Sequence, residues 1–217
     1  MKYKNIIFDF DGVLAESVYI KTQAFYKLYE QYGKEIAEKV VTHHEVNGGM
    51  SRFEKFPYYH KTFLKIDLNE NDVEKLSDDF SKLVIDAVVD ADEVPGALWF
   101  LKKYKRVSKY WIASATPTDE INEIAKKRGM YDYFISIYGS PENKSSIVKN
   151  IINKDKLVNS ETVFFGDAMS DYRAAKDNSI NFILRLTKEN QNLFRDYTGL
   201  IYFIDFHELN SILERTN

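Results

Sequence analysis

Residues 5–14 read NIIFDFDGVL, a short apolar run that ends in two aspartates and a glycine. A continuous apolar run, here residues 5–10, is typical of a strand buried on both faces of a helix-covered parallel sheet. Alternation along an extended chain places Asp9 and Asp11 on the same side. Two carboxylates so close repel each other unless a cation or a proton compensates. They could bind a metal or act as nucleophile and general acid/base, and an ordinary solvated turn is the alternative.

Similar apolar runs recur along the chain and alternate with helix-length segments. The runs are residues 110–114, 134–138, 162–165, 181–186 and 200–204, and the helical segments include residues 95–104, 119–128 and 144–152. This alternation predicts an α/β fold, with a Rossmann-like parallel sheet core flanked by helices.

Residues 17–89 break the alternation, because they show helical periodicity and no convincing strand. We therefore expect a core built from residues 1–16 and 90–217, with residues 17–89 forming an inserted α-helical cap domain. The tail, residues 193–217, is expected to add a strand and a closing helix to the core.

Composition narrows the range of functions. The net charge of the 217 residues is −3 and neither sign forms a long block, which argues against nucleic acid or an anionic membrane as partner. The absence of Cys excludes disulfides, thiolate metal sites and Cys nucleophiles, and the four His lack metal-ligand spacing. No stretch approaches the ~20 apolar residues of a membrane span, and the N-terminal run is too short for a signal peptide. We expect a cytoplasmic protein, as a monomer or a small homo-oligomer.

Ligands in open α/β sheets bind at the carboxyl ends of the strands, which directs attention to two further segments. Ser114 ends one apolar run and is followed by Thr116-Pro117, a pattern that also predicts a helix N-cap and first helical residue. Ser140-Pro141 predicts the same arrangement before Lys144. A cation in a first helical turn is unfavourable to the helix dipole, which hints at a compensating anion.

The segment after the run 162–165 carries two more carboxylates, Asp167 and Asp171. Ser170 as an N-cap, with Asp171 at the positive end of the helix, is the simple structural interpretation. If both carboxylates converge with Asp9, the cluster demands a hard cation, and oxygen ligands favour Mg²⁺.

Together these segments resemble the four motifs of the haloacid dehalogenase-like hydrolase superfamily, in their order. The resemblance implies that Asp9 attacks phosphorus to form an aspartyl-phosphate, and that Asp11 protonates the leaving group and then activates water. It also implies that Ser114, Ala115 and Lys144 bind the phosphoryl group, and that Mg²⁺ lies among the carboxylates, which are Asp9, Asp11, Asp167 and Asp171. Many members have Lys-Pro at the third motif, whereas this chain has Lys144-Ser145. To act as an acid Asp11 needs a raised pKa, which we expect its carboxylate neighbours to supply.

The inserted segment resembles the helical cap of phosphoglycolate phosphatase-like and β-phosphoglucomutase-like members. Within it, residues 48–52 read GGMSR, similar to the cap loop with which β-phosphoglucomutase-like enzymes meet a substrate's distal phosphate or acidic group. Arg52 suits a planar, bidentate contact of that kind, and Lys55 is a second candidate. A solvated surface role is the alternative for Arg52.

The resemblance implies a Mg²⁺-dependent phosphatase that acts on a small phosphorylated metabolite. A phosphomutase is the alternative. Mutases of this family tend to carry a cap His shortly after the first motif, and residues 17–21 contain none, which favours hydrolysis. A catalytically idle binding module is a further alternative, although such proteins usually lose the nucleophile or a metal carboxylate.

Overall fold

A computed structural model describes residues 2–215 and contains one six-stranded parallel sheet, with strand order β3-β2-β1-β4-β5-β6. The strands are β1 (Asn5–Phe8), β2 (Lys109–Pro117), β3 (Ser136–Ser140), β4 (Thr162–Gly166), β5 (Asn181–Arg185) and β6 (Tyr202–Phe203). The predicted α/β fold and its strands are confirmed. Met1, Thr216 and Asn217, at the ends of the predicted core, lie outside the described residues.

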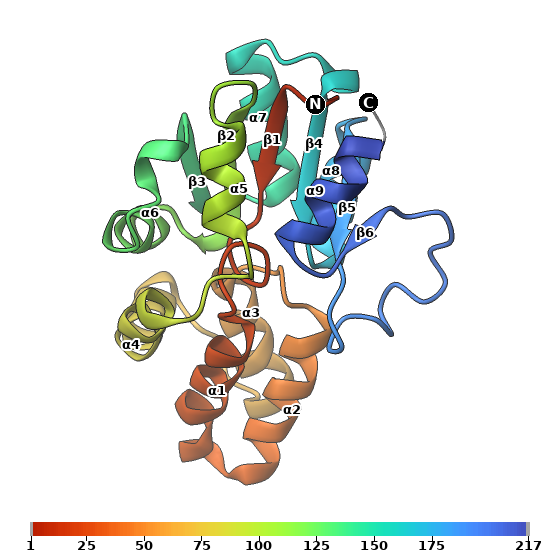
Figure 1. Cartoon of the computed structure of the whole chain (residues 1–217). Helices are drawn as coiled ribbons and strands as arrows, with labels where there is room; N and C mark the ends of the chain where they lie inside the picture. The colour runs from red at the N-terminus through yellow and green to blue at the C-terminus, as the bar shows by residue number, and fades with distance from the viewer. Residues whose placement is uncertain (1, 216–217) are drawn as a thin grey trace.

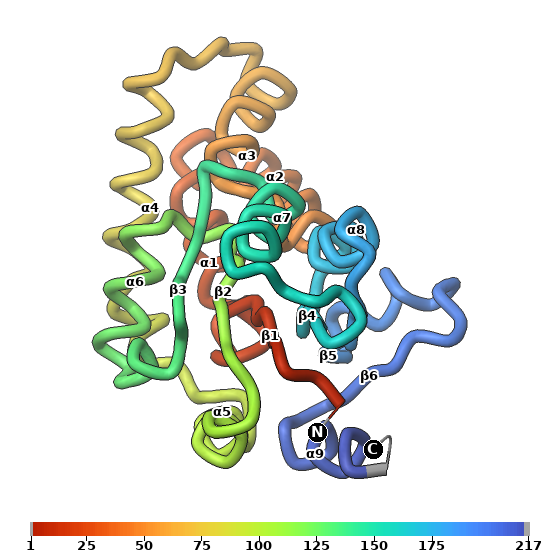
Figure 2. Tube along the Cα trace, turned by 90° about the horizontal axis from the view of Figure 1, so that it is seen from above, coloured from red at the N-terminus to blue at the C-terminus, as the bar shows by residue number. Residues whose placement is uncertain are grey.

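Helices cover both faces of the sheet (Figures 1 and 2). One face carries α5 (Ala97–Tyr104) and α9 (Phe206–Arg215), the other α7 (Lys144–Asp155) and α8 (Met169–Asp177), and α6 (Thr118–Lys127) packs beside β2 and β3. Successive side chains of β1 point to opposite faces of the sheet, so this strand contributes to the apolar layer on each face. The Phe8 ring contacts Phe100 and Phe206 on the first face, at centroid distances of 6.5 and 6.3 Å, whereas Ile7 packs in the second apolar cluster. Burial on both faces explains why β1 is apolar without interruption.

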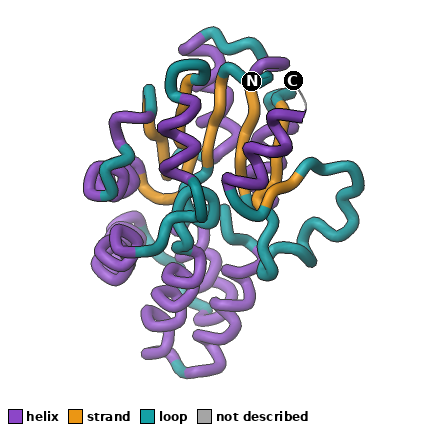
Figure 3. Tube along the Cα trace, viewed as in Figure 1, coloured by secondary structure: helices purple, strands orange, loops and turns teal. Residues whose placement is uncertain are grey.

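The inserted segment consists of helices and loops, with no strand among residues 18–90 (Figure 3). Its helices are α1 (Val18–Tyr29), α2 (Lys34–Val46), α3 (Arg52–Tyr59) and α4 (Glu70–Asp90), with a 3₁₀ turn at Glu30–Tyr32 and a π turn at His60–Leu64. Two further 3₁₀ turns, Tyr131–Tyr133 and Asn159–Glu161, lie between core elements. Figure 1 shows the four helices gathered beyond the carboxyl end of the sheet.

The chain leaves the core and returns to it through two paired segments. Ala15 and Glu93 form an antiparallel bridge. The Glu16 amide donates to the Asp92 carbonyl at 2.9 Å, and the Val94 amide donates to the Leu14 carbonyl at 3.2 Å. The insert is therefore joined to the core by a short two-stranded connection.

Two predicted helix starts are wrong, because the strands before them run further than expected. Strand β2 continues through Thr116 to Pro117, which pairs with Ser140 at the end of β3. Helix α6 therefore begins one residue after Pro117, and Thr116 is no cap. Helix α7 is capped by Asn143, whose side chain accepts a hydrogen bond of 2.9 Å from the third helical amide.

Within residues 2–215, none of the helices combines the length and the apolar character that crossing a bilayer requires.

Candidate active site

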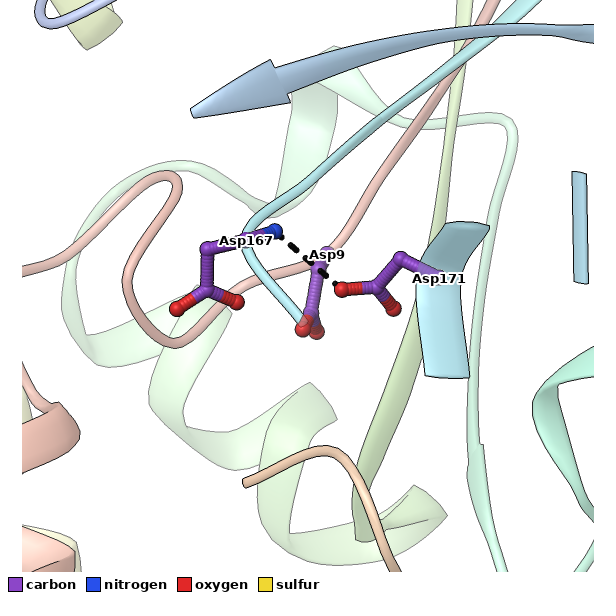
Figure 4. Close-up of side chains that lie close together, drawn as sticks. All are labelled: Asp9, Asp167 and Asp171. Carbon is purple, nitrogen blue, oxygen red and sulfur yellow. Dashed lines mark hydrogen bonds between the residues drawn. The ribbon is translucent and has the colours of Figure 1, made fainter. Parts of the chain in front are cut away.

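Three carboxylates meet at the carboxyl end of the sheet (Figure 4). Asp9 directly follows β1, Asp167 directly follows β4, and Asp171 lies in the first turn of α8. One oxygen from each lies within 4.8 Å of the others. Asp171 Oδ2 accepts hydrogen bonds from the amides of Asp167 and Ala168, at 3.2 and 2.9 Å. Asp171 thus fixes the loop before α8, whose N-cap is Ala168 and not Ser170 as predicted. An all-oxygen cluster of this kind could hold a hard divalent cation.

Lys144 supplies a positive charge to the same cluster. Its Nζ lies 2.5 Å from Asp9 Oδ2 and 2.5 Å from Asp171 Oδ1, and all three side chains are buried. Burial alone would lower the pKa of Lys144, but Asp171 and Asp9 raise it above its ordinary value. The expectation of an anion beside this first-turn lysine is confirmed, because two carboxylates face it.

One cation does not balance three carboxylates, of which Asp9 and Asp171 are buried and Asp167 is half-buried. Burial, with Asp171 and Asp11 nearby, raises the pKa of Asp9 from 3.8 to about 7 even though Lys144 opposes the shift. Burial and the neighbouring Asp9 raise the pKa of Asp167 well above its ordinary value. Burial and mutual repulsion thus favour the protonated forms of these carboxylates, and a bound cation would oppose this effect.

Asp11 belongs to a different network, so three of the four predicted metal carboxylates are gathered in the cluster. Its Oδ1 accepts from Ser17 Oγ at 2.6 Å, and its Oδ2 contacts Lys21 Nζ and accepts from Thr116 Oγ1 at 3.1 Å. Burial alone would raise the pKa of Asp11, but Lys21 and these hydrogen bonds hold it below its ordinary value. The expectation of a raised pKa is wrong, because a cap lysine and not another carboxylate lies closest to Asp11.

Ser114, at the end of the buried part of β2, is fully buried, and its Oγ accepts a hydrogen bond of 3.1 Å from the Thr116 amide. Ala115 lines the cavity over the acidic cluster. Both therefore lie where the strand order brings β2 beside β1 and Asp9.

Two glycines allow the backbone to approach the acidic residues closely. Gly12 has φ of 73°, and a Cβ there would lie 2.2 Å from Asp167 Oδ2. Gly49, in the inserted segment, approaches the first turn of α8 so closely that a Cβ would lie 1.8 Å from Ser170 Oγ. A side chain at either position would force the first motif or the cap away from the site.

The core and the inserted helices together line a cavity over the acidic cluster. The core contributes Asp9, Asp11, Ala115, Thr116 and Asp167, and the insert contributes Lys21, Phe25, His44, Arg52, Lys55 and Phe80 among others.

Arg52 and Lys55 both line this cavity and both are buried, which contradicts a solvated surface role for Arg52. The Arg52 guanidinium is paired with Glu120 of α6. Lys55 Nζ lies 2.8 Å from Nδ1 of His44. The two predicted cap residues are therefore present at the site, but protein partners already hold both.

Sequence reasoning missed three residues here, namely Lys21, His44 and Glu120. Lys21 could have been found, because it stands four residues after Ser17 and so shares a face of α1 with it. Glu120 gives no such signal, since 68 residues separate it from Arg52.

Comparisons with known proteins agree with this architecture. A model of the haloacid dehalogenase-like hydrolase family matches residues 6–185. A phosphorylated carbohydrates phosphatase of Thermotoga maritima is 26% identical over 183 residues, which is 82% of this chain and 82% of that protein. The β-phosphoglucomutase of Clostridium difficile has a TM-score of 0.76 at 19% identity, covering 98% of this chain and 96% of the other. CbbY of Rhodobacter sphaeroides, crystallised with xylulose-(1,5)bisphosphate, has a TM-score of 0.75 at 16% identity, covering 95% and 96%.

The family match covers most of the chain, from β1 through β5, and so includes all the carboxylates of the site. The chain therefore belongs to the haloacid dehalogenase-like hydrolase family.

Proposed function

We propose that this protein is a Mg²⁺-dependent phosphatase that hydrolyses a phosphorylated carbohydrate through an aspartyl-phosphate on Asp9. The observation that carries the proposal is the position of Asp9, which lies between Lys144 and two further carboxylates and also faces the cavity. A nucleophilic carboxylate needs such a cation to approach a phosphate dianion. We further propose that residues 17–89 act as a cap that closes over the site, because both parts of the chain line the cavity.

The chemistry follows from the arrangement of these side chains. An Asp9 oxygen attacks phosphorus as the bond to the leaving oxygen breaks, and the protonated form of Asp11, which Lys21 keeps the minor form, gives that oxygen its proton. Water then attacks the phosphorus of the aspartyl-phosphate, gives its proton to Asp11, and releases phosphate and free Asp9. Ser114, the Ala115 amide and Lys144 stabilise the equatorial phosphoryl oxygens. When bound to Asp9, Asp167 and Asp171, Mg²⁺ supplies the remaining positive charge that the incoming phosphate requires.

The substrate class rests on the relative from Thermotoga maritima, which is named for phosphorylated carbohydrates. Hydrolysis is favoured over phosphoryl transfer between sugar positions because the inserted residue that contacts Asp11 is Lys21 and not a histidine.

Phosphate release from a panel of sugar monophosphates, phosphoglycolate and nucleotides tests this function, with Mg²⁺ and with a chelator. We expect phosphate release from at least one sugar phosphate when Mg²⁺ is present, and no release when the chelator is present. Isomerisation of a sugar monophosphate that requires a bisphosphate would instead establish a mutase. A protein that neither binds Mg²⁺ nor forms a phosphoenzyme would contradict both.

We expect Lys21→Ala to lower kcat by about 10²-fold, because the variant loses the cation that orients the general acid/base. KM should change little, since Lys21 contacts Asp11 and Thr116 and not the phosphoryl site. Steady-state kinetics with Lys21→Arg should show partial recovery of kcat. Lys27→Ala, at an exposed position of the same helix, is the control, and an unchanged kcat in Lys21→Ala would exclude the role.

Mg²⁺ affinity should depend steeply on pH. Since the pKa of Asp9 is about 7 and that of Asp167 is also raised, protons compete with the cation below neutral pH. We expect affinity to fall about tenfold per pH unit for each proton displaced as the pH drops below neutrality. Calorimetry in buffers of different ionisation enthalpy measures the released protons directly. Binding without proton release would show that the carboxylates are already ionised.

A further inference from the structure

Arg52 and Glu120 form a buried ion pair between the cap and the core. Arg52 begins α3, and Glu120 lies in the first turn of α6. The Arg52 Nη1 and Nη2 donate to Glu120 Oε2 and Oε1 at 2.9 and 2.7 Å, which is a bidentate contact. Only 4% and 5% of the two side chains are exposed. The full positive charge of the guanidinium is therefore compensated inside the protein.

The remaining contacts of Arg52 also lie within the protein. Its Nη1 donates to Ser81 Oγ at 2.7 Å and to the Ser77 carbonyl at 3.3 Å, and its guanidinium lies 4.4 Å from the centroid of the Phe80 ring. The Ser81 hydroxyl in turn donates to Glu120 at 2.5 Å. Arg52 lines the substrate cavity, whereas Glu120 lies behind it on α6 and is not among the residues lining the cavity.

The second basic side chain of the inserted segment, Lys55, is also held by protein partners. Its Nζ contacts His44 Nδ1 at 2.8 Å and the Gly48 carbonyl at 3.4 Å, and the side chain is almost fully buried. Burial, together with the charge of Lys21, lowers the pKa of Lys55 well below its ordinary value. Burial and the charge of Lys55 likewise lower the pKa of His44. A buried lysine whose charged form is disfavoured can bind hydroxyl groups, but it offers less charge to an anion than an exposed lysine does.

We propose that Glu120 is a specificity-determining residue, which withholds Arg52 from the substrate and so selects leaving groups that are neutral and hydroxyl-bearing. The inference rests on the proposed phosphatase function and narrows it to monoesters of sugars or polyols. A leaving group with a second phosphate or a carboxylate would lose its hydration against this wall of the cavity without gaining a free cation.

Glu120→Gln tests the proposal, because it keeps the shape of the side chain but leaves the charge of Arg52 uncompensated at the cavity. The substrates are matched pairs, which are glucose 6-phosphate with glucose 1,6-bisphosphate, and glycerol 3-phosphate with 3-phosphoglycerate. We expect the ratio of kcat/KM, anionic over neutral leaving group, to rise about 10- to 100-fold, as for a gained hydrogen bond between charged groups. Glu123→Gln, at a half-exposed position of the same helix, should leave the ratio unchanged.

A double variant, Arg52→Met with Glu120→Leu, distinguishes a role in selecting the leaving group from a structural role in holding the inserted helices against the core. It removes the cap–core ion pair but provides no cation, so the ratio should stay at the wild-type value. An equal loss on both members of each pair in Glu120→Gln would make the ion pair a structural brace and overturn the proposal. So would a gain for anionic substrates in the double variant.

Binding separates failure of this inference from failure of the phosphatase function. In an Asp9→Asn background, calorimetry gives the affinities of the same four compounds without turnover. Preference for the neutral member, reversed by Glu120→Gln, supports the role of Glu120 even if none of these compounds is hydrolysed. Equal affinities with and without Glu120→Gln overturn it, whether or not wild-type protein releases phosphate.

Discussion

Asp9→Asn should abolish phosphate release, with kcat reduced on the order of 10⁴-fold or more, as expected when a nucleophile is removed. The amide retains the size of the side chain, but it cannot attack phosphorus and is a poor ligand for a hard cation. The proposed phosphoenzyme should also disappear. Rapid quench with ³²P-labelled substrate measures it directly, and acid-stable label on the variant would mean that another residue is the nucleophile.

The same variant should remain folded, and its stability gives a second readout. Since the pKa of Asp9 is raised from 3.8 to about 7, the folded protein binds more protons than the unfolded chain between these values. Stability therefore falls as the pH rises from about 4 to 7, and this loss is complete above the folded-state pKa. Without metal near pH 8, we expect Asp9→Asn to melt at or above the wild-type temperature. Asp132→Asn, at an exposed position, is the matched control.

Lys144→Met should cost both activity and stability. The variant leaves Asp9 and Asp171 facing each other without their shared cation, and breaking a buried pair in this way costs about 3–5 kcal/mol. Loss of a donor to the phosphoryl group should lower kcat by about 10²–10³-fold. Urea denaturation monitored by circular dichroism measures the first effect, and phosphate release measures the second.

Adding Mg²⁺ shows whether Lys144→Met loses stability through uncompensated charge or through altered packing. If the cost arises from uncompensated carboxylates, saturating Mg²⁺ should restore a large part of the lost stability, because the cation binds the same oxygens. Lys149→Met, at an exposed position of α7, should behave as wild type. Equal destabilisation with and without Mg²⁺ would assign the loss to packing.

The parallel sheet could be predicted because each strand is a continuous apolar run, and the residues after β1 and β4 carry acids that a sheet of this topology must bring together. The starts of helices α6 and α7 could not be predicted from the local sequence. Thr116-Pro117 and Ser140-Pro141 have the local chemistry of caps, but pairing between Pro117 and Ser140 extends β2 to Pro117 and β3 to Ser140. Tertiary pairing therefore outweighed the local signal.

The charge state of the site depends on contacts that spacing does not reveal. Asp11 is close in sequence to Asp9, yet Lys21 of α1 and nearby hydroxyl groups hold its pKa below the ordinary value, against the effect of burial. Arg52 has the sequence context of a substrate ligand, yet its guanidinium is paired with Glu120, which lies on a helix far away in the sequence. Such pairs form only when the cap folds against the core, so no local pattern in the sequence identifies them.

The paired connection at Ala15 and Glu93 has a consequence for how this chain can change over evolutionary time. Because the two crossings adjoin each other, the ends of the insert meet at one point of the core surface, as the ends of a transplantable module do. Another helical segment with similarly adjoining ends can replace it without altering the strands that present Asp9 and Ser114. One recombination event can then give the same phosphoryl chemistry a new substrate.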